Sequence, residues 1–316
     1  MRIKNTIKSL LKNLHSHKKS EPDIYIFSLP RTGSTLLAEI LNTDSNSKTA
    51  SESLSLTKDN IQVLRKYFNK DVLSERYVDV SEQSLHEIIE YYELLAEGKT
   101  WNSYYWSDFL TSNHSFKTTR TIFKTHKVTY YFDELMGHFN NDYGIYLLRH
   151  PVSHALSRLR KGWDSYISIY ATAKKIKNII PHKAILKIRE VNATGSDLEK
   201  FVVSWCLENY IFIHSHQNNS LPPNILPVFY EELVTNPEVT LKNICAKIKM
   251  KYTKEMANLV SIPSSGTIHS TNETKDQIIA GNKNFLINRW KETLDINTEK
   301  ELKSILVCFG IHLYLE

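Results

Sequence analysis

Cysteine is scarce in this chain. Its three cysteines, Cys206, Cys245 and Cys308, are spread over a sequence of 316 residues, so they form neither a CxxC pair nor a cluster of metal ligands. Three thiols cannot all pair, and we expect them to be reduced residues of the protein core. Reduced cysteines suit a reducing compartment, so the expected location is the cytoplasm.

Long apolar runs are absent as well. No stretch approaches the ~18 apolar residues that span a bilayer, and the N-terminus lacks the continuous apolar stretch of a secretory signal. The sequence therefore predicts a soluble protein. With 41% hydrophobic residues, 23% charged residues and a full set of aromatic side chains, its composition is typical of a folded globular chain and not of a disordered one.

Most of the chain also lacks an excess of charge. The 40 Lys and Arg residues outnumber the 34 Asp and Glu residues, but six of the cations lie before the first acid, Glu21. Residues 21–316 therefore carry 34 charges of each sign, which excludes a generally basic nucleic-acid-binding surface. Apolar residues of the first segment recur at helical spacing beside these cations: Ile3, Ile7, Leu10, Leu11 and Leu14. We expect residues 1–20 to form a basic amphipathic arm that packs on the body or contacts a membrane surface or a partner.

Strand-like and helix-like segments alternate along the chain. Runs of β-branched and aromatic residues predict strands over 23–29, 121–126, 143–149 and 225–230, and Pro227 places the last one at an edge or a strand start. Apolar periodicity predicts helices over 36–41, 84–98, 151–163, 198–214, 237–248 and 298–309, the second with a capping box at Ser84 and Glu87. The polar composition of residues 261–284 predicts a mobile loop. The alternation predicts an α/β fold with a central, mainly parallel sheet flanked by helices.

The first predicted strand ends in a turn that suits a phosphate. The run Pro30–Thr35 reads PRTGST and leads directly into a helix, so it directs unpaired backbone N–H groups, hydroxyls and a guanidinium at one place. Gly33 permits the backbone bend, while Ser34 and Thr35 can cap the helix and donate to an anion. The turn has one glycine and no lysine, so it is not a Walker A loop, and this weakens a kinase or NTPase interpretation.

A second arginine ends a later strand. Arg149 closes the run 143–149, Pro151 opens the following helix, and Ser157 lies about two turns into it. Ligands of open α/β sheets bind at the carboxyl ends of the strands, so Arg149 and Ser157 can converge on a second phosphate. Two anion sites at one edge of a sheet predict a ligand with two phosphate groups.

Together, the two motifs resemble those of the sulfotransferases that use 3′-phosphoadenosine-5′-phosphosulfate (PAPS). The run Pro30–Leu37 is similar to their 5′-phosphosulfate loop, and Arg149 with Ser157, eight positions apart around an early proline, is similar to their 3′-phosphate motif. The run Phe229–Pro237 is similar to a later strand, turn and helix of the same fold. The resemblance spans about residues 23–250. It implies a single P-loop-like α/β domain over residues 21–316 that binds PAPS and transfers its sulfuryl group to a hydroxyl or an amine.

The resemblance also implies which residues bind the donor. Arg31 takes the basic position on the 5′-phosphosulfate, in a cradle formed by Thr32, Gly33, Ser34 and Thr35. Arg149 and Ser157 hold the 3′-phosphate. The pair Trp290-Lys291 looks like a Trp-basic pair of the family, which makes Lys283, seven residues ahead, a further candidate for the 3′-phosphate. Leu36 stands where the animal cytosolic members have a tryptophan, so no adenine-stacking aromatic residue is assigned.

Two residues are candidates for the general base. Lys124-Thr125-His126 resembles the Lys-Thr-His of cytosolic sulfotransferases, whose lysine supports the leaving group and whose histidine takes the proton of the acceptor. Bacterial carbohydrate-type members use a glutamate shortly after the first helix, where this chain has Glu52. Both His126 and Glu52 stay candidates, with Arg31 and Lys124 as catalytic cations. This chemistry requires no metal, and the spacing of the histidines predicts no metal site.

The expected function is therefore sulfuryl transfer from PAPS to an acceptor hydroxyl of a carbohydrate, a glycolipid or a small molecule. An aromatic cluster is a candidate wall for this acceptor, or else part of the core: Trp101, Tyr104, Tyr105 and Trp106. One alternative is a nucleotide-dependent phosphotransferase on the same fold, which would need Mg²⁺ and a Walker-type lysine. The other is a noncatalytic anion-binding or membrane-binding protein that depends on the N-terminal arm.

Overall fold

The structure is a computed structural model, and it describes residues 16–57, 60–68, 77–101 and 117–315. Most of the expected arm lies outside these ranges, as do Tyr104, Tyr105 and Trp106 of the aromatic cluster. Of the helices described, none is long and apolar enough to cross a membrane.

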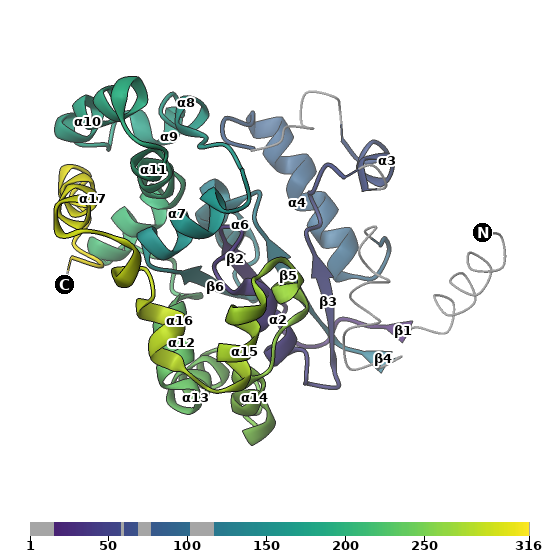
Figure 1. Cartoon of the computed structure of the whole chain (residues 1–316). Helices are drawn as coiled ribbons and strands as arrows, with labels where there is room; N and C mark the ends of the chain where they lie inside the picture. The colour runs from purple at the N-terminus through teal and green to yellow at the C-terminus, as the bar shows by residue number, and fades with distance from the viewer. Residues whose placement is uncertain (1–15, 58–59, 69–76, 102–116, 316) are drawn as a thin grey trace.

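A five-stranded parallel sheet forms the centre of the fold (Figure 1). Its strands lie in the order β3-β5-β2-β6-β7. Their bounds are Ile24–Ser28 (β2), Ser47–Ser51 (β3), Arg120–Thr125 (β5), Tyr143–Leu148 (β6) and Ile225–Phe229 (β7). All neighbouring strands run parallel, which confirms the predicted fold class. Pro227 lies in β7 at one edge, as its missing N–H group predicts. A separate pair consists of β1 (Ser16–His17) and β4 (Lys117–Thr118).

The two faces of the sheet bury different kinds of side chain. In β2, Ile24 and Ile26 join one core cluster and Tyr25 and Phe27 the other, because successive side chains of a strand alternate. The aliphatic face packs against α2 (Ser34–Leu41) and α13 (Pro237–Lys247). The aromatic face packs against α4 (Glu82–Ala96), α6 (Phe132–His138) and α11 (Asp197–Gln217). Burial on both faces explains why the strands read as nearly continuous apolar runs.

Helix α11 is the main support of the aromatic face. It begins with a capping box of Ser196 and Glu199 and is buried along its centre. Phe212 of this helix stacks on Tyr146 of β6, with 3.8 Å between the ring centroids. Burial of a ring of this size contributes about 1.5–3 kcal/mol, so α11 holds in place the strand that leads into Arg149.

The remaining helices cover the two layers and the ends of the sheet. Between β2 and β7 they are α3 (Asn60–Leu64), η2 (Thr129–Tyr131), α7 (Pro151–Leu159), α8 (Ile167–Tyr170), α9 (Lys174–Lys177) and α10 (His182–Thr194). After β7 they are α12 (Tyr230–Thr235), α14 (Lys254–Asn258), η3 (Leu259–Ser261), η4 (Ser265–His269), α15 (Asn272–Ile279), α16 (Lys283–Asn288), η5 (Lys291–Thr293) and α17 (Ile296–Cys308).

Several local predictions are wrong. Ser81 caps α4 by accepting a hydrogen bond from the N–H of Ser84, so the helix begins before the predicted capping box. Residues 261–284, predicted as a mobile loop, contain η4 and α15 and begin α16. Their polar side chains serve as caps: the hydroxyl of Thr271 accepts from the N–H of Thr274 at the start of α15. The edge strand β3 was not predicted, because its residues are small and polar.

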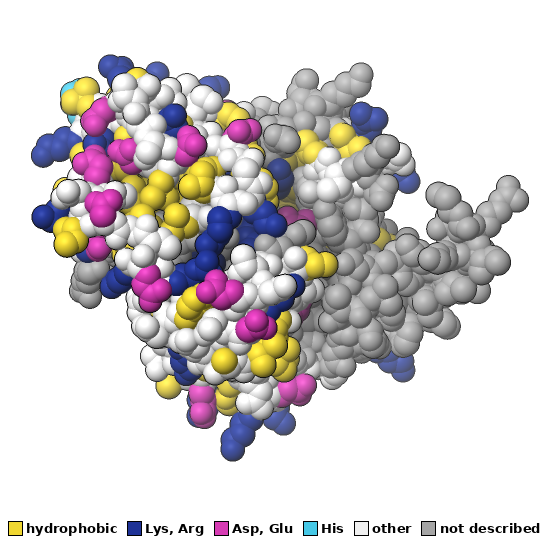
Figure 2. Space-filling view, viewed as in Figure 1, with side chains coloured by type: hydrophobic (Ala, Val, Ile, Leu, Met, Phe, Trp, Pro, Cys, Tyr) yellow, Lys and Arg dark blue, Asp and Glu magenta, His cyan; other side chains and the backbone are white. Residues whose placement is uncertain are grey.

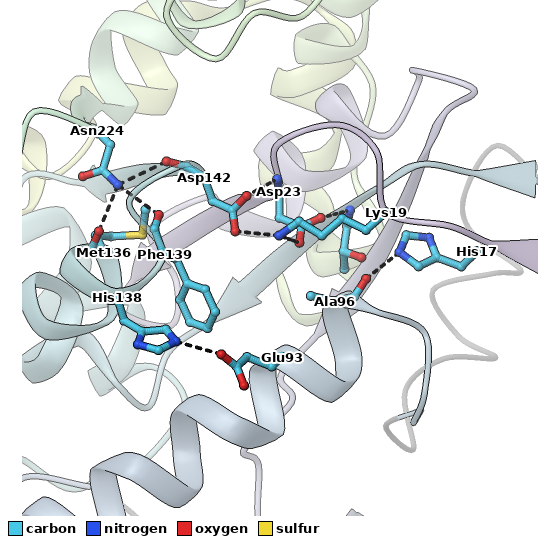
Figure 3. Close-up of polar contacts among 11 residues, drawn as sticks. His17, Lys19, Asp23, Glu93, Ala96, Met136, His138, Phe139, Asp142 and Asn224 are labelled. Atoms are coloured by element: carbon cyan, nitrogen blue, oxygen red, sulfur yellow. Dashed lines mark hydrogen bonds and ion pairs between the residues drawn. The ribbon is translucent and has the colours of Figure 1, made fainter.

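A charge cluster with two buried carboxylates joins the amino ends of the central strands (Figure 3). Nζ of Lys19 lies 2.7 Å from Oδ2 of Asp23 and 2.8 Å from Oδ2 of Asp142. Oδ1 of Asp142 accepts from the N–H of Asp23, and Oδ1 of Asp23 accepts from the N–H of Thr121 in β5. Burial raises the pKa of Asp23 to about 6, although Lys19 lowers it. The cluster lies at the opposite end of the strands from the cleft described next, so it supports the sheet that carries the site.

Candidate functional site

The carboxyl ends of the parallel strands open into a cleft of about 1340 Å³. Four strands each lead into a residue that lines it: Arg31 after β2, Glu52 after β3, His126 after β5 and Arg149 after β6. Ligands of parallel α/β sheets bind at this edge. Figure 2 shows Lys and Arg side chains gathered along a hollow across the middle of the molecule. The topology thus brings together residues that are far apart in the sequence.

The turn after β2 forms a tight cradle. Gly33 has a φ of 96°, in the left-handed region that favours glycine, and it caps α2. A Cβ atom at this position would lie 2.6 Å from the ring of Tyr230, so only glycine fits. Thr32 is buried and donates its hydroxyl to the carbonyl of Leu29, 2.7 Å away. Because α2 begins at Ser34, its first N–H groups have no intrahelical acceptor and are available to an anion.

The two predicted anion motifs meet in the cleft. Nε of Arg31 donates to Oγ of Ser157 at 3.1 Å, and Nη1 of Arg149 donates to the carbonyl oxygen of Arg31 at 3.1 Å. Burial and the charge of Arg149 lower the pKa of Arg31. The two guanidinium groups therefore repel each other, and an anion between them would relieve this repulsion.

The guanidinium of Arg149 has a hydrogen-bond donor that the described residues leave unpaired. Its guanidinium lies over the ring of Tyr230, with 4.5 Å between Cζ and the ring centroid. Its Nε is buried without a hydrogen-bond partner in the described part of the chain. Leaving such a group unpaired costs about 1–3 kcal/mol, so Nε is well placed to donate to a bound ligand.

Lys124 lies between the phosphate turn and the candidate bases. Its Nζ lies 3.2 Å from Oγ1 of Thr35 and 3.2 Å from Oε1 of Glu52. The same carboxylate oxygen lies 2.7 Å from Nε2 of His126. The structure therefore brings both candidate bases together, because β3 and β5 are adjacent and the N–H of Glu52 donates to the carbonyl of Lys124.

The charges around Glu52 keep it ionised. Burial alone would raise the pKa of Glu52, but His126 and Lys124 outweigh burial and lower that pKa to about 2. Glu52 also has a φ of 50°, as Arg31 has one of 75°, so two non-glycine residues of the cleft adopt the left-handed conformation. Strained backbone of this kind costs of order 1–3 kcal/mol and is concentrated at functional sites.

The ring of His126 is held from both sides. Nδ1 lies 2.9 Å from the carbonyl oxygen of Ser28, which can only accept, so Nδ1 carries a hydrogen. Nε2 lies 2.7 Å from Oε1 of Glu52. Both ring nitrogens therefore already have a protein partner in this arrangement. The contacts of Glu52 with Lys124 and His126 described above are both made at Oε1.

Lys283 lies outside this cleft. It is exposed at the start of α16, and its Nζ donates to the carbonyl of Thr235. Arg289, which follows α16, lines the cleft instead, together with Arg160 after α7. Sequence reasoning singled out neither residue. Arg289 directly precedes Trp290, and a search beside this tryptophan, instead of seven residues ahead, would have found it.

Other supporting residues were also missed. Nε2 of His154 lies 3.0 Å from the carbonyl of Pro30 and so fixes the phosphate turn, while burial lowers the pKa of His154 and keeps the ring neutral. Glu39 lines the cleft and accepts hydrogen bonds from the N–H and the hydroxyl of Ser265. This contact holds η4 against α2. A lone buried histidine or a helical glutamate carries no sequence signal for such a role.

Another part of the cleft is aromatic. Trp163 is 40% exposed, and it lines the cleft with Tyr166. Nη2 of the buried Arg158 donates to the carbonyl of Asp164, which holds the loop that carries both rings. Trp101, from the cluster predicted as an acceptor wall, is not among the residues that line the cleft.

The chain is similar in structure to several solved sulfotransferases. The sulfotransferase domain from the curacin biosynthetic pathway is 16% identical, with a TM-score of 0.47 over 94% of this chain and 100% of that one. The domain from the Synechococcus PCC 7002 olefin synthase is 17% identical, with a TM-score of 0.48 over 94% and 98%. Mouse sulfotransferase SULT7A1, solved in complex with PAP, is 14% identical, with a TM-score of 0.43 over 96% and 89%. A comparison with curated protein sequences gives no significant match.

The sequence itself identifies the family. Residues 22–254 match the profile of the sulfotransferase family. This range covers more than half of the chain and includes the phosphate turn, Glu52, Lys124, His126 and the Arg149–Ser157 motif. The chain belongs to the sulfotransferase family.

Proposed function

We propose that this protein transfers the sulfuryl group of PAPS to an acceptor hydroxyl by in-line displacement. The observation that carries the proposal is the position of Lys124, whose ammonium group contacts both Thr35 of the phosphate turn and Glu52. A cation in this place can stabilise charge on the leaving phosphate while a base acts on the acceptor. Membership of the sulfotransferase family supports the reaction class.

The residues of the cleft fit a nucleotide with phosphate groups at both ends of the ribose. The ring of Tyr230 leaves no room for a Cβ atom at Gly33. A phosphate can therefore approach the N–H groups of α2 without meeting a side chain at this position. The unpaired Nε of Arg149 is a donor that still needs an acceptor. We propose that Arg31 and the run Thr32–Thr35 hold the 5′-phosphosulfate, and that Arg149 and Ser157 hold the 3′-phosphate. The bound donor supplies an activated sulfuryl group.

We further propose that Glu52 is the proton acceptor and that His126 positions it. Both ring nitrogens of His126 already have protein partners, and the contacts of Glu52 with Lys124 and His126 are made at Oε1. A carboxylate with a pKa of about 2 is a weak base for a free alcohol. The hydroxyl of the acceptor becomes far more acidic as its oxygen bonds to sulfur, so the proton moves to Glu52 late in the attack. Lys124 and His126 keep the carboxylate ionised and oriented until then.

The acceptor is proposed to bind beside the exposed ring of Trp163. Trp163 and Tyr166 offer flat apolar surface, and Glu52 offers a hydrogen-bond acceptor for a hydroxyl. A sugar ring or another flat alcohol presents one apolar face and polar edges, which matches this combination. Candidate acceptors are therefore carbohydrates, glycolipids and small hydroxyl compounds.

Calorimetry with adenosine-3′,5′-bisphosphate (PAP) tests the donor site. We expect the wild-type protein to bind PAP, and Arg149→Ala to weaken binding by more than about tenfold, because a hydrogen bond to a charged group contributes about 1.5–3 kcal/mol. Arg189→Ala, on the exposed side of α10, is the matched control and should not change the affinity. Absence of PAP binding by the wild-type protein would overturn the proposal.

A transfer assay tests the reaction. With labelled PAPS and a panel of hydroxyl acceptors, we expect label to move to at least one acceptor and the rate to be unchanged by EDTA. Transfer of phosphate from ATP that depends on Mg²⁺ would show instead that the protein is a phosphotransferase.

A further inference from the structure

One surface of the protein carries cations without acids of its own. Residues 165–189 contain six Lys and Arg residues and no Asp or Glu, although the two signs of charge are equal over residues 21–316. The segment folds into α8, α9 and the first part of α10, and these helices pack on α11. In Figure 2, Lys and Arg side chains project along the upper edge of the molecule, where Figure 1 places α8 and α10. This edge therefore bears a local positive charge.

Four of these six cations have no carboxylate beside them in the described part of the chain. Lys175 forms ion pairs with two acids of α6, and Lys187 with one acid of α10 and one of α17. Asp79 accepts a hydrogen bond from the backbone N–H of Lys174, 2.9 Å away. The four exposed cations without an ion pair among the described residues are Lys174, Lys177, Lys183 and Arg189.

Apolar side chains are exposed on the same segment. Leu186 of α10 is 50% exposed and Ile169 of α8 is 42% exposed, although the outward face of a helix that packs on the core is usually polar. Exposed aliphatic side chains among lysines are typical of a protein surface that lies in a membrane interface. Of the large apolar side chains that the described residues leave exposed, five lie between residues 159 and 186: Leu159, Trp163, Ile169, Ile179 and Leu186.

These side chains favour a lipid bilayer over a protein or a nucleic acid as the partner. Lysine is depleted at protein–protein interfaces, and three of the four exposed cations are lysines. A nucleic acid would use aromatic rings for stacking, but Tyr170 of α8 is buried. Lysines attract anionic lipid headgroups, and exposed aliphatic side chains enter the boundary between headgroups and acyl chains.

We propose that α8, α9 and α10 form a docking surface for an anionic lipid bilayer. Trp163 lines the cleft and lies four residues before α8, so the docked surface borders the side of the cleft at which the acceptor is proposed to bind. The docking itself does not depend on the proposed function, and it uses a part of the chain separate from residues 1–20. We name this the α8–α10 surface, formed by Ile169, Lys174, Lys177, Ile179, Lys183, Leu186 and Arg189.

Flotation with vesicles tests the α8–α10 surface. We expect the full-length protein to bind vesicles of phosphatidylcholine mixed with phosphatidylglycerol, and not vesicles of phosphatidylcholine alone. The triple variant Lys174→Gln/Lys177→Gln/Lys183→Gln should bind the anionic vesicles about a hundredfold more weakly, because each lysine near an anionic surface strengthens binding about fivefold. These side chains are exposed, so thermal unfolding of the variant should match that of the wild type.

A second triple variant is the matched control. Lys247→Gln/Lys251→Gln/Lys254→Gln removes three exposed cations around α13 and α14, which lie at the lower edge of Figure 1, away from α8–α10. It changes the net charge by the same amount and should bind the vesicles as the wild type does. An equal loss in both triple variants would show a general effect of net charge and would overturn the inference.

The apolar side chains are tested at constant charge. Ile169→Gln/Leu186→Gln should weaken binding to the anionic vesicles about tenfold or more, because the exposed aliphatic groups no longer enter the bilayer. Binding equal to wild type would show that the surface attracts anions without entering lipid, as expected for an acidic protein or a nucleic acid as partner, and the inference would fail.

Two further results would overturn the inference. The wild-type protein could fail to bind the anionic vesicles, or Lys4→Gln/Lys8→Gln/Lys12→Gln could abolish binding that the α8–α10 triple variant retains, which would identify residues 1–20 as the anchor. Calorimetry with PAP separates this inference from the proposed function, since all of these variants should bind PAP as the wild type does. A wild-type protein that binds anionic vesicles but not PAP would sink the proposed function and leave the docking surface standing.

Discussion

Nζ of Lys124 lies 3.2 Å from Oε1 of Glu52, at the point where the ends of β5 and β3 lie side by side. Lys124 thus links Glu52 with the phosphate turn, because the same ammonium group also contacts the hydroxyl of Thr35. A residue in this position can act on both donor and acceptor. Its removal should therefore affect the transfer step more than the binding of either ligand.

Lys124→Met should lower the turnover number about a hundredfold or more, because removal of one preorganised charge-stabilising donor typically costs 10²–10³ in rate. The affinity for PAP should change much less, since Arg31, Arg149 and Ser157 remain. Steady-state kinetics with PAPS and calorimetry with PAP measure the two effects separately. An equal loss in both measurements would mean that Lys124 acts in donor binding and not in the transfer step.

Glu52→Gln and His126→Gln should lower the turnover number to different extents. Glu52→Gln removes the proton acceptor and should lower the turnover number about 10²–10⁴-fold without weakening PAP binding. His126→Gln retains the acceptor and should lose much less, about tenfold. A larger loss for His126→Gln than for Glu52→Gln would identify the histidine as the base.

The pH profile gives a second distinction between these residues. Wild-type Glu52 has a pKa lowered to about 2, so it stays ionised at neutral and mildly acidic pH. Without His126, the carboxylate loses the strongest of the interactions that lower its pKa, and this pKa should rise toward its ordinary value of about 4.3. The activity of His126→Gln should then fall as pH drops through 5 toward 4. A profile with the same acid limb as wild type would contradict a positioning role for His126.

Gly33→Ala should damage both the fold of the phosphate turn and donor binding. Gly33 has a φ of 96°, and a Cβ atom there would lie 2.6 Å from the ring of Tyr230. Gly310→Ala is a matched control with a φ of 67°, where a Cβ atom would meet only Pro181 at 4.0 Å. Both variants bear left-handed strain of about 1–2 kcal/mol, but only Gly33→Ala adds the clash. Thermal unfolding and PAP calorimetry should show a larger loss for Gly33→Ala, and equal losses would contradict the role of the cradle.

The sequence allowed prediction of the fold class and the main elements of the cleft, because apolar strands and the turn Pro30–Thr35 are local signals. The juxtaposition of Glu52 with His126 could not be deduced from periodicity, since it depends on β3 pairing with β5, and β3 is too polar to be recognised as a strand. Arg289 was missed for a related reason. Residues 261–284 have the composition of a loop, so nothing in the sequence indicated that α15 and α16 pack together and that Arg289 lines the cleft.

The charge cluster at the amino ends of the strands makes stability depend on pH. The pKa of Asp23 is raised to about 6 in the folded protein, above its value of about 3.9 in the unfolded chain, so the folded state binds more protons between these values. Stability from this group therefore falls as pH rises from 4 to 6. Lys19, which forms ion pairs with Asp23 and Asp142, opposes this rise in the pKa of Asp23.

Lys19→Met should therefore destabilise the protein more at pH 8 than at pH 5. At pH 8 it leaves two buried carboxylates close together without a cation, which should cost about 2 kcal/mol, a discounted value because Lys19 is partly exposed. At pH 5 the pKa of Asp23, raised further by the loss of Lys19, lets this carboxyl hold a proton and avoid the repulsion. Lys18→Met, the exposed neighbour, should have no effect at either pH. Urea unfolding at both pH values measures the difference, and a loss that is equal at pH 5 and pH 8 would show that Asp23 does not titrate in this range.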